Sequence, residues 1–339
     1  MFRNKLTYIV LSGIVSIVLL WLLFSKIDFT DLTLAFSRIF PPALAFYIAV
    51  ALLGAWLRAW RYKWLLYPHP VGWGNILLVT FIRNSLIDLL PARLGSLSYI
   101  YVLNKRLGFR FETATSSFIV AFVLDFLTIS PFLILSLLAV GINAEAVSAP
   151  LLLAVAAAFF ILVGIFYWKI TPIAGWILLI LRRLLRAVGI EEKKSSRLFV
   201  AKFELTIQSL ESIRRRGKAI PIFILSLLIR LAKYISLFAL FYAFLRAQGY
   251  SLAQLSFWVF ILGLSGAELT SALPIKGLAG FGTWETAWAL TFGLLGFDPK
   301  LAVVTGIGVH FLTNLFEYSL GLASILILVR PYLWKRREK

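Results

Sequence analysis

Long apolar runs are the feature of this sequence that most restricts its fold. They lie near residues 6–24, 43–66, 118–140, 151–167, 219–245 and 301–329. A helix needs about 20 apolar residues to cross the hydrocarbon core of a bilayer, and only helices and closed barrels satisfy every backbone hydrogen bond there. The six runs therefore predict six transmembrane helices in an all-α polytopic membrane protein. No small-residue cleavage pattern follows the first run, which favours a retained span over a signal peptide.

Two further apolar segments, 76–101 and 252–295, are each broken near the middle by Pro and Gly. Basic residues in short loops stay on the cytoplasmic side of a membrane. A full crossing by the first segment would place the basic loop 105–110 outside, against this rule. We therefore expect two oppositely oriented re-entrant hairpins. The first enters from the cytoplasm with its tip at 91–95, and the second enters from outside with its tip at 274–282.

The same rule orients the whole chain. Basic residues concentrate near the N-terminus, in 182–218 and in the tail 331–339, whereas the remaining loops hold few of them. We therefore predict an integral inner-membrane protein with both termini in the cytoplasm.

The sequences around the two hairpins resemble each other. Arg58-Ala-Trp-Arg61-Tyr62 precedes the first hairpin and Arg230-Leu-Ala-Lys233-Tyr234 precedes the second. Both tips contain Leu-Pro followed by a basic residue, and both hairpins end in Leu-Gly-Phe with an Ala five residues later. These matches predict an inverted repeat, the arrangement that many transporters use to build a site near the bilayer midplane. The predicted units are a first transmembrane helix with an outside loop (1–41), a first repeat (42–145), a transmembrane helix with a basic cytoplasmic segment (146–218), a second repeat (219–330) and a basic tail (331–339).

Ionisable residues inside the spans and hairpins are the candidate site residues, because each costs about 2.5–3.5 kcal/mol to insert. Basic residues dominate, which favours an anionic ligand such as a lipid phosphate, and the planar guanidinium of Arg suits phosphate geometry. The candidate substrate-binding residues are Arg58, Arg61, Arg93, Arg230, Lys233, Lys276, Gly280, Gly282 and Glu285. The candidate charge partners or proton-relay groups are Asp88, Asp125, Glu268, Glu317 and His310.

Several of these residues also have purely structural interpretations. The alternatives are headgroup contacts for Arg58 and Arg61, an ion pair with Glu268 or Glu317 for Arg230 and Lys233, a first-turn acid with Thr283 as cap for Glu285, and a hydrogen-bonded core position for His310.

Five motifs occur in a fixed order across residues 40–330: Arg58-Ala-Trp-Arg61, Leu90-Pro91-Ala92-Arg93-Leu94-Gly95, Asp125, Leu273-Pro274-Ile275 and Gly280-Phe281-Gly282-Thr283-Trp284-Glu285. Together they resemble the lysylphosphatidylglycerol synthase transmembrane, or flippase-like, family. The resemblance implies a polytopic fold that moves aminoacylated or other lipids across the inner membrane. Members are often fused to a soluble synthase domain, which we expect to be absent here. The sequence differs from the family pattern at Ser96, Phe122 and Trp284, where the family commonly has Glu, Arg and Arg.

The composition excludes several other classes of function. The chain has no Cys and two His, so we expect no disulfide, no metal centre and no cofactor. A net charge of +19 does not indicate nucleic-acid binding, because cytoplasmic loops already require most of it.

The favoured function is a transporter that moves an anionic or phosphate-bearing lipid between leaflets, with membrane lipids as its partners and without enzymatic activity. One alternative is a membrane-embedded transferase that acts on a lipid-linked substrate. The other is an assembly partner of a separate lipid synthase or glycosyltransferase. The sequence leaves the oligomeric state open.

The predicted orientation can be tested with cysteines, because the chain has none of its own. A membrane-impermeant thiol reagent applied to intact cells should label single cysteines introduced at Asn143 and Asp298, and should leave one at Asn104 unlabelled. Labelling of the Asn104→Cys protein from outside would contradict the first hairpin.

Overall fold

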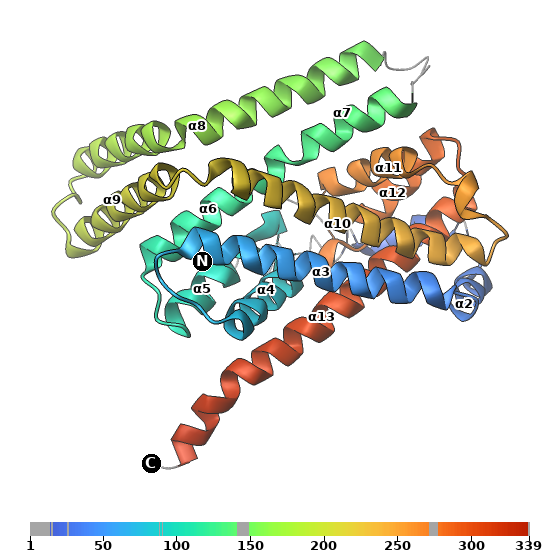
Figure 1. Ribbon diagram of the computed structural model, residues 1–339, viewed down its shortest axis with the longest axis horizontal. Helices are drawn as coiled ribbons and strands as arrows, with labels where there is room; N and C mark the ends of the chain where they lie inside the picture. Colours follow the sequence, from blue (N-terminus) through green and yellow to red (C-terminus); the bar gives the residue numbers. More distant parts are fainter. Residues whose placement is uncertain are drawn as a thin grey trace.

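The computed structural model describes residues 14, 16–25, 27–87, 89, 91–140, 149–270 and 277–337, and within these ranges it contains helices and no strand (Figure 1). Residues 16–24 are helical. The α-helices that follow are α2 (Phe29–Ser37), α3 (Pro41–Leu66), α4 (Trp73–Ile87), α5 (Ser98–Lys105), α6 (Phe111–Leu127), α7 (Ile129–Val140), α8 (Ala149–Ala187), α9 (Lys194–Arg215), α10 (Ala219–Arg246), α11 (Phe257–Thr270), α12 (Thr283–Leu294) and α13 (Pro299–Arg337). The short 3-10 helices are η1 (Pro91–Leu97), η2 (Leu252–Gln254) and η3 (Leu278–Gly280).

Five helical segments in the described ranges are long and apolar enough to cross a membrane. They are Pro41–Leu66, Phe111–Val140, Leu153–Ala187, Ala219–Arg246 and Pro299–Leu328. These segments correspond to five of the six predicted spans, and the predicted polytopic all-α fold is confirmed. The sixth predicted span, near 6–24, lies partly outside the described residues, and its described residues 14 and 16–24 are helical.

One boundary differs clearly from its prediction. The sequence predicted a span over 151–167, but α8 continues as one helix to Ala187. Lys169 and Pro172 interrupt the apolar run without ending the helix, because the apolar residues 173–181 continue it. The basic residues Arg182 and Arg183 therefore belong to the last turns of α8 rather than to a separate segment.

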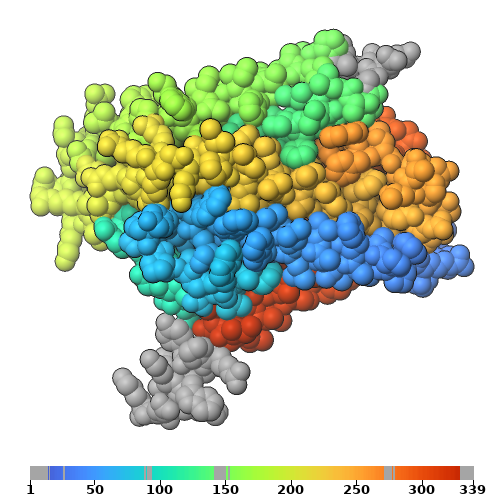
Figure 2. Space-filling model, in the orientation of Figure 1, coloured from blue at the N-terminus to red at the C-terminus, as the bar shows by residue number. Residues whose placement is uncertain are grey.

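Helices α3 and α10 form the most extensive helix pair of the fold. They run in opposite directions in Figure 1 and lie side by side across the face seen in Figure 2. At one close approach, a Cβ added to Gly54 on α3 would lie 3.6 Å from Cβ of Ala232 on α10. Helix α13 packs against α4, α12 and α10, and α9 packs against α6 and α8.

Each of the two segments predicted as hairpins contains a pair of short α-helices: α4 and α5 with η1 between them, and α11 and α12 with η3 between them. Helix α4 packs on η1 and α5, and α11 packs on α12. The two pairs lie toward opposite ends of the molecule (Figure 1). In the first break, Gly95 lies so close to α4 that an added Cβ would be 1.5 Å from the carbonyl oxygen of Leu86. In the second break, residues 271–276 lie outside the described residues, and Gly280 and Gly282 adopt φ of 83° and 88°, which favours glycine.

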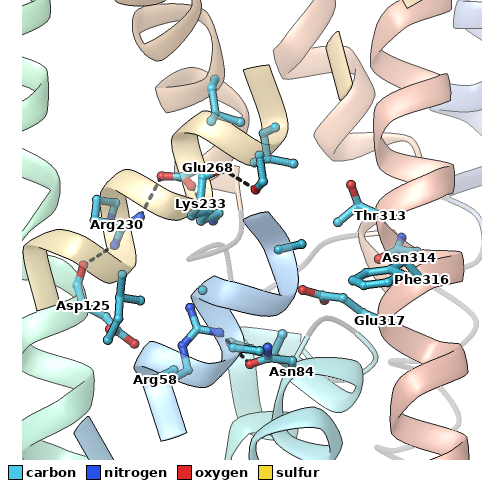
Figure 3. A pocket seen from close by; sticks show the side chains of 18 of the residues that line it. Arg58, Asn84, Asp125, Arg230, Lys233, Glu268, Thr313, Asn314, Phe316 and Glu317 are labelled. Carbon is cyan, nitrogen blue, oxygen red and sulfur yellow. Dashed lines mark hydrogen bonds and ion pairs between the residues drawn. The ribbon is translucent and has the colours of Figure 1, made fainter. Parts of the chain in front are cut away.

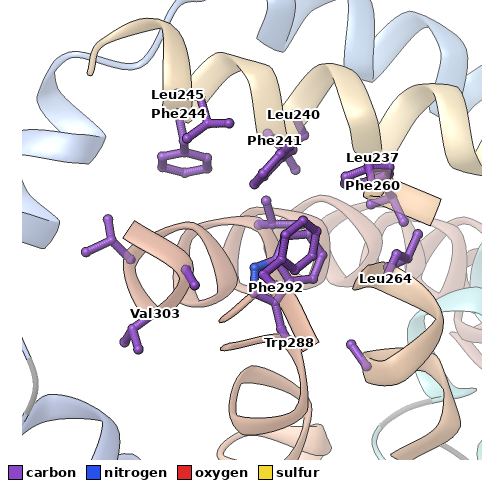
Figure 4. Packing of buried hydrophobic residues seen from close by; sticks show 14 of the residues in the cluster. Leu237, Leu240, Phe241, Phe244, Leu245, Phe260, Leu264, Trp288, Phe292 and Val303 are labelled. Carbon is purple, nitrogen blue, oxygen red and sulfur yellow. The ribbon is translucent and has the colours of Figure 1, made fainter. Parts of the chain in front are cut away.

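An aromatic cluster fixes the second pair of helices against α10 (Figure 4). The rings of Trp288 and Phe292 on α12 stack at 4.4 Å, and Phe241 of α10 lies 5.1 Å from Phe292 and 5.3 Å from Phe260 of α11. In a membrane, lipid removes most of the hydrophobic driving force, so close packing carries helix association. Gly263 of α11 permits this packing, because a Cβ there would lie 2.5 Å from the Phe292 ring.

The close approach at Gly263 predicts that Gly263→Ala destabilises the protein by about 1–3 kcal/mol, because the rigid Phe292 ring must move. Gly293→Ala on α12 is the matched control, since nothing lies within 4 Å of a Cβ at that position. The control should be neutral or slightly stabilising, because Ala is a better helix former than Gly. Thermal unfolding in detergent measures both, and equal stability of the two variants would contradict the packing described.

Candidate functional site

A cavity of about 210 Å³ lies among α3, α4, α6, α10, α11, α12 and α13 (Figure 3). Its wall combines apolar side chains with an unusual number of charges for a membrane-spanning bundle. The charged groups among the described lining residues are Arg58, Arg83, Arg230, Lys233, Asp125, Glu268 and Glu317. Four cations therefore face three carboxylates, apart from His310, which also lines the cavity.

The Asp125 carboxylate on α6 joins several helices. Its Oδ1 lies 2.8 Å from Nη1 of Arg61 on α3, and its Oδ2 lies 3.3 Å from Nη2 of Arg83 on α4. The Arg61 side chain is fully buried, and it also donates to the hydroxyl of Ser226 on α10. Arg230 of α10 donates to the backbone carbonyl of Asp125. The alternative of headgroup contact does not hold for Arg61, because the Asp125 carboxylate neutralises its charge inside the bundle.

A second carboxylate, Glu268 on α11, binds two cations of α10. Nζ of Lys233 lies 2.5 Å from Oε1 and Nη1 of Arg230 lies 3.3 Å from Oε2 (Figure 3). This is the ion pair expected as the structural alternative for Arg230 and Lys233. Both residues nevertheless line the cavity, and the Lys233 side chain is 38% exposed. Its ammonium is thus the accessible member of the group.

Arg58 differs from the other arginines of the cavity. Its Nη1 donates to the neutral amide oxygen of Asn84 at 2.7 Å, and it forms no ion pair with a described residue. Its Nε is buried without a hydrogen-bond partner in the described part of the chain, and the same holds for Nε of Arg83 and Nδ2 of Asn314. Buried donors without acceptors are costly, so the cavity is suited to an anion that accepts from donors such as these.

The second break contributes an acid and an imidazole. Glu285 is fully buried, and its Oε1 lies 2.6 Å from Nδ1 of His310 while its Oε2 accepts the backbone N–H of Gly282 at 2.8 Å. The His310 ring stacks on Trp284 at 4.7 Å. The Gly282 contact is the first-turn role expected as the alternative for Glu285. The expected cap, Thr283, is wrong: Gly282 is the N-cap, and Thr283 is the first residue of α12 and donates to the carbonyl of Gly280.

The predicted site residues thus fall into three groups. Those that line the cavity are Arg58, Arg230, Lys233, Gly280, Asp125, Glu268, Glu317 and His310. Behind the wall lie Arg61, Gly282 and Glu285. The third group, outside the described residues, comprises Asp88, Lys276 and the side chain of Arg93.

Sequence reasoning did not select two amide side chains of the cavity, Asn84 and Asn314. The charged Arg83 beside Asn84 in the same apolar helix was the available signal for the first of them. No group of three or more His, Asp or Glu is placed to hold a metal ion within the described part of the chain.

A sequence model of a family described as the lysylphosphatidylglycerol synthase TM region matches residues 9–321. The match includes every helix that lines the cavity. A search of curated proteins found no match.

The Asp125 cluster predicts that Asp125→Asn destabilises the fold by about 3–5 kcal/mol, because it leaves buried guanidinium groups without their counter-charge. Asp31→Asn is the matched control. Asp31 on α2 pairs with Lys300 at 2.9 Å at an exposed site, and this contact holds the pKa of the Asp31 carboxyl below its ordinary value.

Because solvent screens the exposed pair, Asp31→Asn should change stability little. Adding Arg61→Gln to Asp125→Asn should recover part of the loss, since it removes one of the abandoned charges. Thermal unfolding in detergent measures these three variants together with the Arg61→Gln single variant. Strictly additive losses in the double variant would show that Arg61 and Asp125 do not interact.

Proposed function

Because the chain belongs to the lysylphosphatidylglycerol synthase transmembrane family, we propose that it is a flippase-like transporter that moves an anionic or phosphate-bearing lipid between leaflets. The family match and the five candidate spans make it an integral membrane protein associated with lipids. One observation carries the finer proposal: the cavity contains more guanidinium and ammonium groups than carboxylates to neutralise them.

The excess positive charge of the cavity can be located by comparing the partners of its arginines. Asp125 is the carboxylate bound by Arg61 and Arg83, while among the described residues Arg58 donates only to the neutral Asn84. Uncompensated positive charge is unfavourable at membrane depth, so a bound anion stabilises this arrangement. A lipid phosphate is the most available anion inside a bilayer, and a guanidinium can bind it through two hydrogen bonds. In this proposal Arg58, Lys233 and the donors beside them bind the headgroup, while Asp125 and Glu268 act as charge partners.

We also propose that the fold is an inverted repeat, in which α3 to α7 correspond to α10 to α13. Matching positions have matching environments: Tyr62 and Tyr234 are both fully buried, and Gly108 and Gly296 both have positive φ, of 72° and 86°. The antiparallel course of α3 and α10 supports the same correspondence (Figure 1). Two opposed halves around one cavity provide a route for alternating access, in which each broken helix pair gates one side.

The proposed orientation follows from the basic loops: both termini lie in the cytoplasm and the protein resides in the inner membrane. In that frame, the α4–α5 pair enters from the cytoplasm and the α11–α12 pair enters from outside. In this proposal the cavity lies near the middle of the bilayer, as in transporters built from inverted repeats. The headgroup would then pass between the two gates, while its acyl chains remain in lipid.

Arg58→Gln and Lys233→Gln test the proposal, because neither removal abandons a carboxylate: Arg58 has a neutral partner, and Glu268 keeps Arg230. Each substitution should weaken binding and transport of an anionic lipid by about 1.5–3 kcal/mol, or more than tenfold, while stability is retained. Arg246→Gln at the exposed end of α10 is the control and should behave like the wild type.

The measurement is scrambling of labelled phosphatidylglycerol in vesicles that contain only the purified protein, beside thermal unfolding in detergent. Transport by the purified chain alone would exclude a role that requires a separate synthase. Wild-type transport in both stable variants would refute the anionic-lipid proposal.

A further inference from the structure

A second cavity lies away from the central one, beside the contact of α9 with α6 and α8. Its volume is about 350 Å³, and no described lining residue is shared with the central cavity. Helices α8 and α9 lie together at one edge of the molecule (Figure 1). The groove is lined almost wholly by apolar atoms, including side chains of Phe111 and Ile119 on α6, Ala174 on α8, and Phe203 and Ile207 on α9. We call it the α9 groove.

One cation lines this groove, and no described residue is its anionic partner. Lys202 of α9 lines it, and its Nζ lies 5.2 Å from the ring centroid of Phe111. It forms no ion pair or side-chain hydrogen bond with a described residue. The two carboxylates nearest to it along these helices are already paired, Glu204 with Arg182 and Glu112 with Arg110. The charge of Lys202 is therefore available to a ligand.

The surroundings of the groove identify the ligand. Helices α6 and α8 belong to candidate spans, so their outer faces contact lipid, and an apolar groove in such a face is filled by an apolar chain. Helix α9 presents exposed Leu198 and Phe199 next to the exposed cations Lys194 and Arg197, a combination typical of a helix at a membrane interface. An ammonium that no described residue pairs, at the edge of an apolar groove, complements an amphiphile with an anionic head.

We propose that the α9 groove binds one acyl chain of an anionic phospholipid, with the phosphate held by Lys202. This lipid is a fixed partner of the α8–α9 unit and is separate from the transported lipid. It fills the space between α9 and the spans and ties α9 to the leaflet that surrounds it. The site stands whether or not the central cavity transports lipid.

The test is native mass spectrometry of the purified full chain, titrated with phosphatidylglycerol or with phosphatidylcholine of the same acyl chains. Lys202→Gln should weaken phosphatidylglycerol binding at one site by about tenfold and leave phosphatidylcholine binding unchanged. Lys194→Gln, on the same helix but away from the groove, should change neither. Ala174→Phe fills the groove and should reduce occupancy by both lipids.

The measurement is repeated in an Arg58→Gln background, which weakens the proposed central site. The effect of Lys202→Gln should persist there, so failure of one site is distinguishable from failure of the other. Because Lys202 forms no ion pair with a described residue, its variant should fold, and the result stands even if Ala174→Phe does not fold. Equal phosphatidylglycerol binding by wild type and Lys202→Gln would overturn the proposal. So would a dimer that Ala174→Phe dissociates without loss of lipid, because the groove would then be an interface between copies.

Discussion

Charge buried at membrane depth persists only where opposite charge and hydrogen bonds surround it, and four helices of this protein meet at one such point. The Asp125 carboxylate of α6 binds Arg61 of α3 and Arg83 of α4, and its backbone carbonyl accepts from Arg230 of α10. Each helix is thereby fixed in rotation about its axis, because turning any one of them would carry a charged group into lipid. The extensive packing of α3 on α10 and the polar wall of the cavity both depend on these fixed rotations.

The two carboxylate clusters of the cavity bind cations in a similar way, but the exposure of those cations differs. Among the described residues, Asp125 and Glu268 each bind two cations, but the cations at Asp125 are almost fully buried while the Lys233 side chain at Glu268 is partly exposed. Arg58 lies on the Asp125 side, and its described hydrogen-bond partner is the neutral amide of Asn84. The cavity therefore combines a rigid, already neutralised framework with a small number of cations that have unused hydrogen-bonding capacity. Such a division holds a site in shape before any ligand enters it.

Most spans could be predicted from the sequence because lipid imposes one requirement on about 20 consecutive residues at once. The end of α8 could not, since Lys169 and Pro172 both resemble terminators and only the continued helix shows that they are not. Charged cavity residues such as Arg58 and Glu268 were identifiable because each is expensive in lipid. Asn84 and Asn314 were not, because a neutral amide in an apolar helix faces lipid, core or cavity according to helix rotation, which distant partners decide.

Helix α8 has little contact with the rest of the bundle: only 11% of its apolar window is buried. Under the proposed opposed arrangement, the first half begins and ends on one side of the membrane, and the second half must begin on the other. One additional crossing between the halves brings the chain to the side on which the second half begins, and α8 provides this crossing. The bilayer part of α8 is then a connector whose requirement is to cross once, with little demand on its side chains. Its lipid-facing sequence is free to drift among relatives, and two separately encoded halves inserted in opposite directions could form the same core without it.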